Sequence, residues 1–438
     1  MRPLADTLNN AAEPMQTGTG NATNDDCPLG AIKALCIQLM RAHRDPASIA
    51  LATDITEAYA QLSSSQRVEF MMMLKNDFAV DPAAIIQAAK DYESDPNFKN
   101  QQSLARVIEA PRQKLFRCIN TASDGLQTLI RMRQDLLGFS LPIRNTLRAV
   151  EEDLKHLLQS WFNSGFLQLW QIDWKSPASL LEKLTEYEAV HQISNWDDLR
   201  RRLQADRRCF AFFHPSMKEE PLVFVEVALT KGIAGNILSL IDPESEVVDP
   251  TTADTAMFYS ISSCQSGLLG ISFGGLLIKQ VVNELQKNLP SIQTFSTLSP
   301  VPGFCRWLGQ QSPDEHESIA SVIEMLQATM RSQQPIDSSL LDDHRDSLMV
   351  LLADYLMTAK IEGRPVDSVA RFHLGNGAKL HAIHWMADES PNGLKNSLGM
   401  MVNYVYDLDQ IQSNRTYFLQ HQVIAAHPSI HALIRSKK

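Results

Sequence analysis

The sequence predicts an α+β protein in which an all-helical domain precedes a mixed α/β domain. Apolar residues recur at helical spacing from about residue 28 to 172, whereas β-rich runs alternate with helical patterns after Trp174. The length of 438 residues also favours more than one domain, because a domain usually holds roughly 100 to 200 residues. We therefore expect a helical domain over residues 28–173 and a mixed domain over residues 174–438.

The composition is that of an ordinary folded protein. Hydrophobic residues make up 44% and charged residues 21% of the chain, which excludes collagen-like, coiled-coil and wholly disordered proteins. The net charge of −10 opposes a large phosphate-neutralising surface, so no nucleic-acid partner is expected. The six cysteines form no Cys-x-x-Cys pair and no zinc-finger spacing with histidine, so neither a disulfide framework nor structural zinc is predicted.

Neither end of the sequence carries an obvious targeting signal. Residues 1–27 are polar, lack the apolar core of a secretory signal, and are expected to form a flexible tail. The chain ends in Ile-Arg-Ser-Lys-Lys, which is not a peroxisomal address. The uncharged stretch from Thr255 to Ile278 contains Ser, Gln and four glycines, so no membrane helix is predicted there. A cytoplasmic location in a bacterium is expected.

The first domain is predicted to contain about seven or eight helices. Pro82 and Pro142 suit the first turn of a helix. Ser63 and Gln66 have the spacing of a capping box ahead of an apolar run. Met71, Met72 and Met73 in that run are interpreted as core filler, because no further sulfur or histidine pattern accompanies them.

The second domain is predicted to alternate helices and strands. Two helical patterns cover residues 177–190 and 195–203. Three β-rich runs follow at residues 208–214, 222–229 and 256–262. Such mixing is typical of an α/β or α+β domain. Further helices are predicted over residues 276–289, 315–330 and 340–357, with strands at 294–298 and 379–385.

A glycine-bearing turn joins the third β-rich run to the helix that follows. Its glycines lie at positions 267, 270, 274 and 275. Free backbone N–H groups and the helix dipole would favour a phosphate at this helix start, and Lys279 lies about one turn into the helix. A turn whose glycines serve only tight packing explains the pattern equally well. The segment is neither a Walker loop nor a clean Gly-x-Gly-x-x-Gly motif.

Ser299 and His373 are candidates for chemistry. Ser299 ends a predicted strand ahead of Pro300, Pro302 and Gly303, a stiff loop that would hold its hydroxyl in place for a ligand. An ordinary turn serine is the simpler interpretation, and no Gly-x-Ser-x-Gly elbow surrounds it. His373 stands in Phe-His-Leu-Gly-Asn-Gly, just before a glycine-rich turn. For any one histidine, an ordinary core or surface role is more common.

Taken together, these segments resemble the malonyl-CoA decarboxylase family. The resemblance is carried by GLLGISFGGLLIKQVVNELQKNLP, FSTLSPVPGF, RFHLGNGAKL and HWMADES, and it spans most of residues 188–406. It implies a catalytic domain similar to the GNAT-type acetyltransferase fold, with malonyl-CoA as substrate and acetyl-CoA and carbon dioxide as products. Because the family forms assemblies and a large helical domain has many apolar faces, a homo-oligomer through that domain is expected.

The resemblance also implies which residues form the site. Its serine of Leu-Ser-Pro-x-Pro-Gly and its histidine of Phe-His-Leu fall on Ser299 and His373, the implied catalytic pair. The acyl-CoA pyrophosphate turn of the acetyltransferases falls on residues 269–274, where Gly274 matches their pattern but Leu269 and Ser272 depart from it. The implied substrate-binding residues besides the pair are Leu269, Gly270, Ile271, Ser272, Phe273, Gly274 and Gly275, with Ser260, Tyr406 and Lys279 in supporting positions.

The implied reaction sets what the site must do. The thioester carbonyl can accept the electron pair left by carbon dioxide, so no cofactor and no metal are expected. Our hypothesis gives Ser299 the positioning of substrate and proton, and His373 the role of general acid. An ordinary imidazole pKa of about 6.5 allows both protonation states near neutral pH. Two alternatives on the same fold remain open, an acyl-CoA-dependent acyltransferase and a non-catalytic malonyl-CoA sensor.

Overall fold

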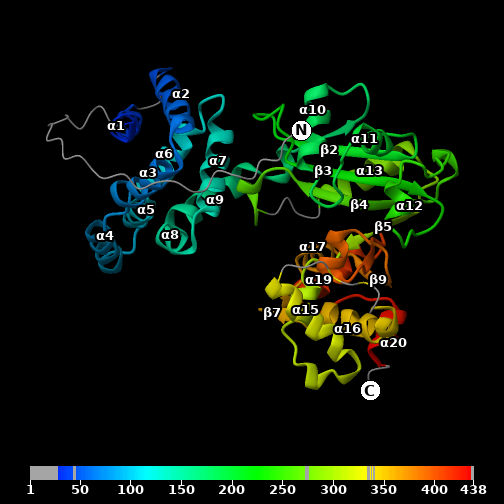
Figure 1. Cartoon of the computed structure of the whole chain (residues 1–438). Coiled ribbons are helices and arrows are strands. Elements are labelled where there is room, and N and C mark those ends of the chain that lie inside the picture. Colours follow the sequence, from blue (N-terminus) through cyan, green and yellow to red (C-terminus); the bar gives the residue numbers. More distant parts are fainter. Residues whose placement is uncertain are drawn as a thin grey trace, which may run out of the picture. The chain divides into compact units, whose positions relative to one another are not determined.

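The chain divides into two compact units, Met1–Leu154 and Lys155–Lys438, and each is described by itself (Figure 1). The first unit is helical and the second is built around a mixed sheet, so the predicted α+β class is confirmed. The predicted tail 1–27 lies outside the described residues. The computed structural model describes residues 28–42, 46–271, 276–332, 336, 338 and 341–435.

The helical unit starts its helices where the sequence places caps. Ser63 precedes α3, and the Ser63 side chain accepts a hydrogen bond from the Gln66 N–H while the Gln66 side chain accepts one from the Ser63 N–H. Pro82 opens α4 after the Asp81 cap. Met71 and Met73 are buried, as expected of core filler, whereas Met72 is half-buried. The helices of the described residues 28–161 are α1 (Pro28–Arg41), α2 (Pro46–Gln61), α3 (Ser64–Asp77), α4 (Pro82–Ser94), α5 (Phe98–Ile108), α6 (Pro111–Ile119), α7 (Gly125–Gly138), α8 (Leu141–Thr146) and α9 (Arg148–Trp161).

The second unit carries an eight-stranded sheet with the order β1-β2-β3-β4-β5-β10-β6, in which β9 also pairs with β10. Buried side chains of α10 and α11 pack against β2 and β3 to form one core cluster. The strands of the sheet are β1 (Gln168–Ile172), β2 (Arg207–Phe213), β3 (Val223–Thr230), β4 (Thr255–Ser263), β5 (Thr294–Thr297), β6 (Ser299–Pro300), β9 (Lys379–His384) and β10 (Met401–Val405), while β7 (Lys360–Ile361) and β8 (Arg364–Pro365) form a separate pair.

The helices of this unit follow the predicted order. The predicted helix 276–289 is α13 and the predicted helix 340–357 is α16, whereas the segment predicted from 315 begins with short 3₁₀ turns and becomes α-helical only at Ala320. The α-helices are α10 (Ala178–Tyr187), α11 (Trp196–Arg202), α12 (Leu238–Ile241), α13 (Leu276–Asn288), α14 (Phe304–Leu308), α15 (Ala320–Ser332), α16 (Arg345–Thr358), α17 (Ser368–Gly375), α18 (Pro391–Ser397), α19 (Ile411–His421) and α20 (Pro428–Arg435). No helix in the described ranges is long and apolar enough to cross a membrane.

The pairing of β4 with β5 positions the candidate site. This pair is parallel, whereas the other strand pairs of the sheet are antiparallel. Its register runs from Thr255↔Thr294 to Phe258↔Thr297 and stops there. Beyond the last pair, β4 continues through Ser260 to Ser263, and the chain after β5 continues to Ser299. Two predicted site residues therefore follow the point at which this pairing ends.

Strand β1 corrects the expectation that the helical pattern continues to residue 172. It pairs antiparallel with β2, from Gln168↔Phe213 to Ile172↔Cys209. The Trp170 ring packs on Phe213 with ring centroids 4.7 Å apart, a cross-strand contact of the kind that stabilises sheets. That contact is made with residues far along the chain, so local spacing around residues 168–172 does not contain it.

Candidate active site

The fold brings Ser299 and His373 together although 74 residues separate them. Ser299 Oγ lies 3.2 Å from His373 Nε2. Ser299 opens β6, which pairs with β10, and His373 lies on α17. Both residues are buried. The implied pair is thus within hydrogen-bonding distance in a site shielded from water, the geometry that acid–base or nucleophilic chemistry requires.

A tyrosine on the far side of the imidazole completes this contact. His373 Nδ1 lies 2.8 Å from the hydroxyl oxygen of Tyr406, so the family position implied for Tyr406 does fall at the pair. The Tyr404 ring stacks on the imidazole at a centroid distance of 4.8 Å. Because both tyrosines are buried, they fix the plane of the imidazole from two directions.

Thr297 was not among the predicted site residues. Ser299 Oγ donates a hydrogen bond to Thr297 Oγ1 at 2.9 Å, and the Tyr404 N–H donates to the same oxygen at 3.1 Å. Thr297 is two residues before Ser299 on an extended segment. Since side chains two apart in an extended segment point the same way, this spacing is a signal that could have identified it.

Burial changes the protonation expected of His373. Removal of the imidazole from water lowers the pKa of His373 to about 3, because an apolar environment disfavours the charged form. The expectation of an ordinary imidazole pKa near neutrality is therefore wrong for this structure. The imidazole is neutral at pH 7. Burial also raises the pKa of the Tyr406 hydroxyl well above its ordinary value, so that hydroxyl keeps its proton.

Ser260 is bound to a different partner. Its hydroxyl donates to the Glu188 carboxylate, at 2.8 Å from Oε1 and 2.7 Å from Oε2. The same carboxylate accepts from Ser262 Oγ at 3.0 Å and from the N–H groups of Val190 and His191. Within the described residues, no hydrogen bond joins Ser260 to Ser299 or His373. Glu188, which sequence reasoning did not single out, therefore ties the segment after α10 to β4.

The predicted phosphate-binding turn is only partly described. Gly270 has a φ of +74°, a backbone conformation that favours glycine. Leu269 is 68% exposed and Ile271 is buried. Lys279 is exposed in α13. Ser272, Phe273, Gly274 and Gly275 lie outside the described residues, so the phosphate-binding role of this turn stays a prediction.

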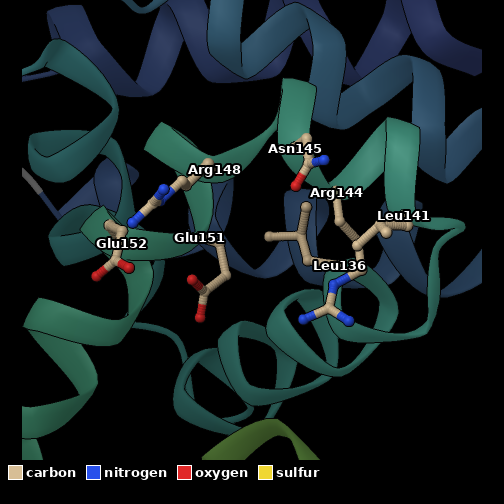
Figure 2. A pocket seen from close by; sticks show the side chains of 7 residues that line it. All are labelled: Leu136, Leu141, Arg144, Asn145, Arg148, Glu151 and Glu152. Carbon is tan, nitrogen blue, oxygen red and sulfur yellow. The ribbon is translucent and has the colours of Figure 1, made fainter. Parts of the chain in front are cut away.

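Two cavities are lined by residues other than Ser299 and His373. One, of about 230 Å³, belongs to the helical unit, and its lining combines two arginines with two glutamates, which Figure 2 shows together with Leu136, Leu141 and Asn145. The other, of about 480 Å³, is mostly apolar and lies between β9, α16 and α20. Neither contains a predicted site residue. Across the described ranges, no group of three His, Cys, Asp or Glu side chains is placed to hold a metal ion.

The fold and the site define an α+β protein with a buried serine–histidine pair beside a mixed sheet. Residues 165–438 match the model of the malonyl-CoA decarboxylase C-terminal domain, and residues 78–162 match that of the malonyl-CoA decarboxylase N-terminal domain. The chain belongs to the malonyl-CoA decarboxylase family.

Individual members of the family are similar to this chain over most of their length. The chain is 37% identical over 390 residues to the mitochondrial malonyl-CoA decarboxylase of Anser anser anser, covering 82% of this chain and 77% of that protein. It is 36% identical over 415 residues to the corresponding protein of Mus musculus, covering 87% and 84%. The crystal structure of malonyl-CoA decarboxylase from Rhodopseudomonas palustris is similar with a TM-score of 0.85 and 40% identity, covering 92% of this chain and 98% of that one. The enzyme from Agrobacterium vitis gives a TM-score of 0.83 and 41% identity, covering 92% and 99%.

Proposed function

We propose that Ser299 and His373 carry out the reaction of this family in this chain, the conversion of malonyl-CoA to acetyl-CoA and carbon dioxide. The chain is a carboxy-lyase by its family. The single observation that supports the assignment of the pair is the buried 3.2 Å contact between Ser299 Oγ and His373 Nε2. A hydroxyl and an imidazole in contact can together orient a bound group and move a proton to or from it.

The decarboxylation consists of two chemical steps, loss of carbon dioxide and protonation of the α-carbon. Loss of carbon dioxide leaves an electron pair on the α-carbon, which the thioester carbonyl accepts to give an enolate; one proton then adds to the α-carbon. The site must hold the carboxylate perpendicular to the carbonyl plane and stabilise the enolate oxygen with hydrogen-bond donors. We propose that no dissociable cofactor takes part, because the substrate itself supplies the electron acceptor.

Each member of the pair has a distinct role in this proposal. Ser299 orients the thioester and the proton donor, and His373 delivers the proton from Nε2 to the α-carbon. With a pKa of about 3, His373 is neutral before substrate arrives. A carboxylate bound beside the imidazole favours its charged form and raises that pKa. The proton that the reaction consumes can therefore enter the site together with the substrate.

The CoA part of the substrate is proposed to bind at the turn of residues 269–275. The positive φ of Gly270 and the exposure of Leu269 support an open, glycine-dependent turn ahead of α13. Lys279 on the first turns of that helix supplies a cation for the phosphates. Ser260, held by Glu188, and Tyr406, held by His373, are proposed to line the acyl end.

The test is turnover of malonyl-CoA, with acetyl-CoA and carbon dioxide both measured. Ser299→Ala and His373→Gln should each lower kcat by about 10² or more, as expected of groups that act on the reacting atoms. Ser413→Ala and His431→Gln, exposed positions of the same unit, are the matched controls and should keep full turnover. Full activity of either site variant would exclude the assigned pair.

The same assay separates the two alternative functions. An acyltransferase would transfer the acyl group to an added amine, and mass spectrometry of the products would detect the acylated amine. A sensor would bind malonyl-CoA in calorimetry without releasing carbon dioxide. Stoichiometric acetyl-CoA and carbon dioxide from malonyl-CoA alone support the decarboxylase.

We also propose a homo-oligomer through the helical unit and a cytoplasmic location in a bacterium. Large apolar side chains are exposed on α4 and α5, including Ile86 at 56%, Phe98 at 71% and Ile108 at 55%, and such surfaces favour association. Light scattering should give a mass above one chain of 49.0 kDa, and Phe98→Lys should reduce it. The five cysteines of the described ranges are free, which suits a reducing compartment.

A further inference from the structure

The Ser299 hydroxyl donates its hydrogen bond to a residue outside the catalytic pair, Thr297. Thr297 Oγ1 receives the Ser299 hydroxyl at 2.9 Å and the Tyr404 N–H at 3.1 Å. A backbone N–H can only donate, so it takes one lone pair of Thr297 Oγ1, and the Ser299 hydroxyl donates to the other. Thr297 is 1% exposed, which leaves little room for water to replace these bonds.

This acceptor determines how Ser299 meets His373. Because the Ser299 proton points to Thr297, Ser299 Oγ presents only lone pairs to the imidazole. A hydrogen bond across the 3.2 Å contact with His373 Nε2 then requires the proton to be on Nε2. His373 would be the neutral tautomer with Nε2–H directed at Ser299.

The hydrogen bond between Tyr406 and the other nitrogen of the imidazole leads independently to the same tautomer. In the part of the chain that the structure describes, the Tyr406 hydroxyl has one hydrogen-bond partner, His373 Nδ1 at 2.8 Å. Tyr406 is 3% exposed. If the Tyr406 oxygen accepted a hydrogen bond from an Nδ1–H group, its own buried O–H would be left without an acceptor, which is unfavourable. Tyr406 therefore donates to Nδ1, and the imidazole proton is again on Nε2.

We propose that Thr297 is a positioning residue that fixes the direction of a buried chain of hydrogen bonds, from Tyr406 through His373 and Ser299 to Thr297. This chain holds the His373 proton on Nε2, where the catalytic pair needs it. The tautomer follows from the geometry of the protein alone, whereas its value for turnover rests on the function proposed above.

The substitution that tests this leaves the backbone in place. Thr297 is paired with Phe258 in the sheet, and the Asn403 side-chain amide donates to the Thr297 carbonyl at 2.7 Å. Thr297→Val keeps the branched shape but replaces the hydroxyl by a methyl, so both Ser299 and the Tyr404 N–H lose their acceptor, and Thr297→Ser keeps the acceptor. Without the acceptor, the Ser299 proton is free to turn to His373 Nε2, which competes with the Tyr406 bond to Nδ1 and should populate the Nδ1–H tautomer in part.

The first readout is the tautomer, measured by NMR of the full chain labelled with ¹⁵N-histidine, with His373→Gln used to identify the signals. Wild type and Thr297→Ser should show Nε2–H, and Thr297→Val should shift towards Nδ1–H. A wild-type His373 with its proton on Nδ1 overturns the proposal, even if no Thr297 variant folds. An unchanged tautomer in a folded Thr297→Val overturns it as well.

The second readout is kinetic. Thr297→Val should lower kcat by about 10² with KM for malonyl-CoA changed less than about twofold, since uniform substrate binding is retained. Thr297→Ser should restore kcat to near wild type. Full kcat in Thr297→Val, with Ser299→Ala inactive, would overturn this inference alone. Full activity of Ser299→Ala would instead reject the proposed function and leave the tautomer result standing.

Discussion

The carboxylate of Asp367 accepts a hydrogen bond from the backbone N–H of Gly303 at 3.2 Å. Gly303 belongs to the loop that follows Ser299, and Asp367 is the N-cap of α17, the helix of His373. The same side chain accepts from the N–H groups of Val369 and Ala370 at 3.0 and 2.9 Å. One buried carboxylate thus joins the serine loop to the histidine helix.

Removal of this carboxylate should affect both stability and turnover. Asp367→Ala loses the cap, which typically costs about 0.5–2 kcal/mol, and it also releases the loop from the helix, so kcat should fall. Asp367→Asn keeps one acceptor oxygen, which can retain the cap, but its NH2 group then faces the Gly303 N–H, so most of the stability should be preserved while kcat still falls. The measurements are urea unfolding and steady-state kinetics.

A cap elsewhere in the same unit provides the control for Asp367. Asn195 caps α11 by accepting from the N–H groups of Asp197 and Asp198. Asn195→Ala should therefore cost similar stability while kcat stays at the wild-type level. Equal losses of kcat in Asn195→Ala and Asp367→Ala would mean that only general stability, and not the link to Gly303, is being measured.

A methyl group at Gly303 should disturb the same loop. A Cβ there would lie 2.3 Å from the Tyr355 hydroxyl oxygen and 3.4 Å from Asp367 Oδ2, and the first distance is too short for any real contact. Gly303→Ala should therefore lower kcat and stability. Tyr355→Phe removes the clashing oxygen, so the double variant should regain much of both. A double variant as impaired as Gly303→Ala in unfolding and turnover would place the strain elsewhere.

The sequence predicted what depends on local spacing and missed what depends on distant partners. The amphipathic spacing of α13 and the β-rich run of β3 are local, and both were predicted from it. Asp367 stands directly before a helical run, so its capping role was accessible from residue type, but its bond to Gly303 spans 64 residues. The role of Thr297 depends on a donor 107 residues away. The lowered pKa of His373 follows from complete burial, which residue type alone does not reveal.

Burial of neutral His373 should make folding sensitive to acid. The ordinary imidazole pKa is about 6.5 and the folded value is about 3, so the unfolded chain binds the proton more readily. The stabilising contribution is complete above pH 6.5 and is lost as the pH falls from 6.5 towards 3. Between pH 7.5 and 5.0 the free energy of unfolding should fall by roughly 2 kcal/mol more in wild type than in His373→Gln.

Urea unfolding at these two pH values measures the difference directly. His431→Gln, an exposed position near the C-terminal end of the described chain, should keep the wild-type pH dependence. A His373→Gln variant that loses as much stability between the two pH values as wild type would show that the imidazole is not buried in its neutral form.

Two aspartates near α11 should differ sharply in their contribution to stability. Asp206 pairs with Arg201 at 2.8 Å and with Arg207 at 2.8 Å, and all three side chains are almost fully buried. Asp206→Ala leaves buried guanidinium groups without their counter-charge, which should cost about 3–5 kcal/mol. Asp197 pairs with Arg200 at the surface, with 70% of the Asp197 side chain exposed, so Asp197→Ala should have little effect. Equal denaturation midpoints for the two variants would contradict this.

Lys279 should contribute to substrate binding and not to the chemical step. It is exposed in α13 and follows the proposed phosphate-binding turn, so its charge can meet a CoA phosphate without touching the reacting atoms. Lys279→Met should raise KM roughly 5-fold, equivalent to about 1 kcal/mol, with kcat unchanged. The difference in KM from wild type should shrink as the salt concentration rises, because an exposed ion pair is screened.

Lys287→Met, in the last turn of the same helix, removes an equal charge away from the turn and should leave KM at the wild-type value. If both variants raise KM alike, the effect comes from the overall charge of the helix; if Lys279→Met lowers kcat instead, the lysine reaches the acyl end of the substrate.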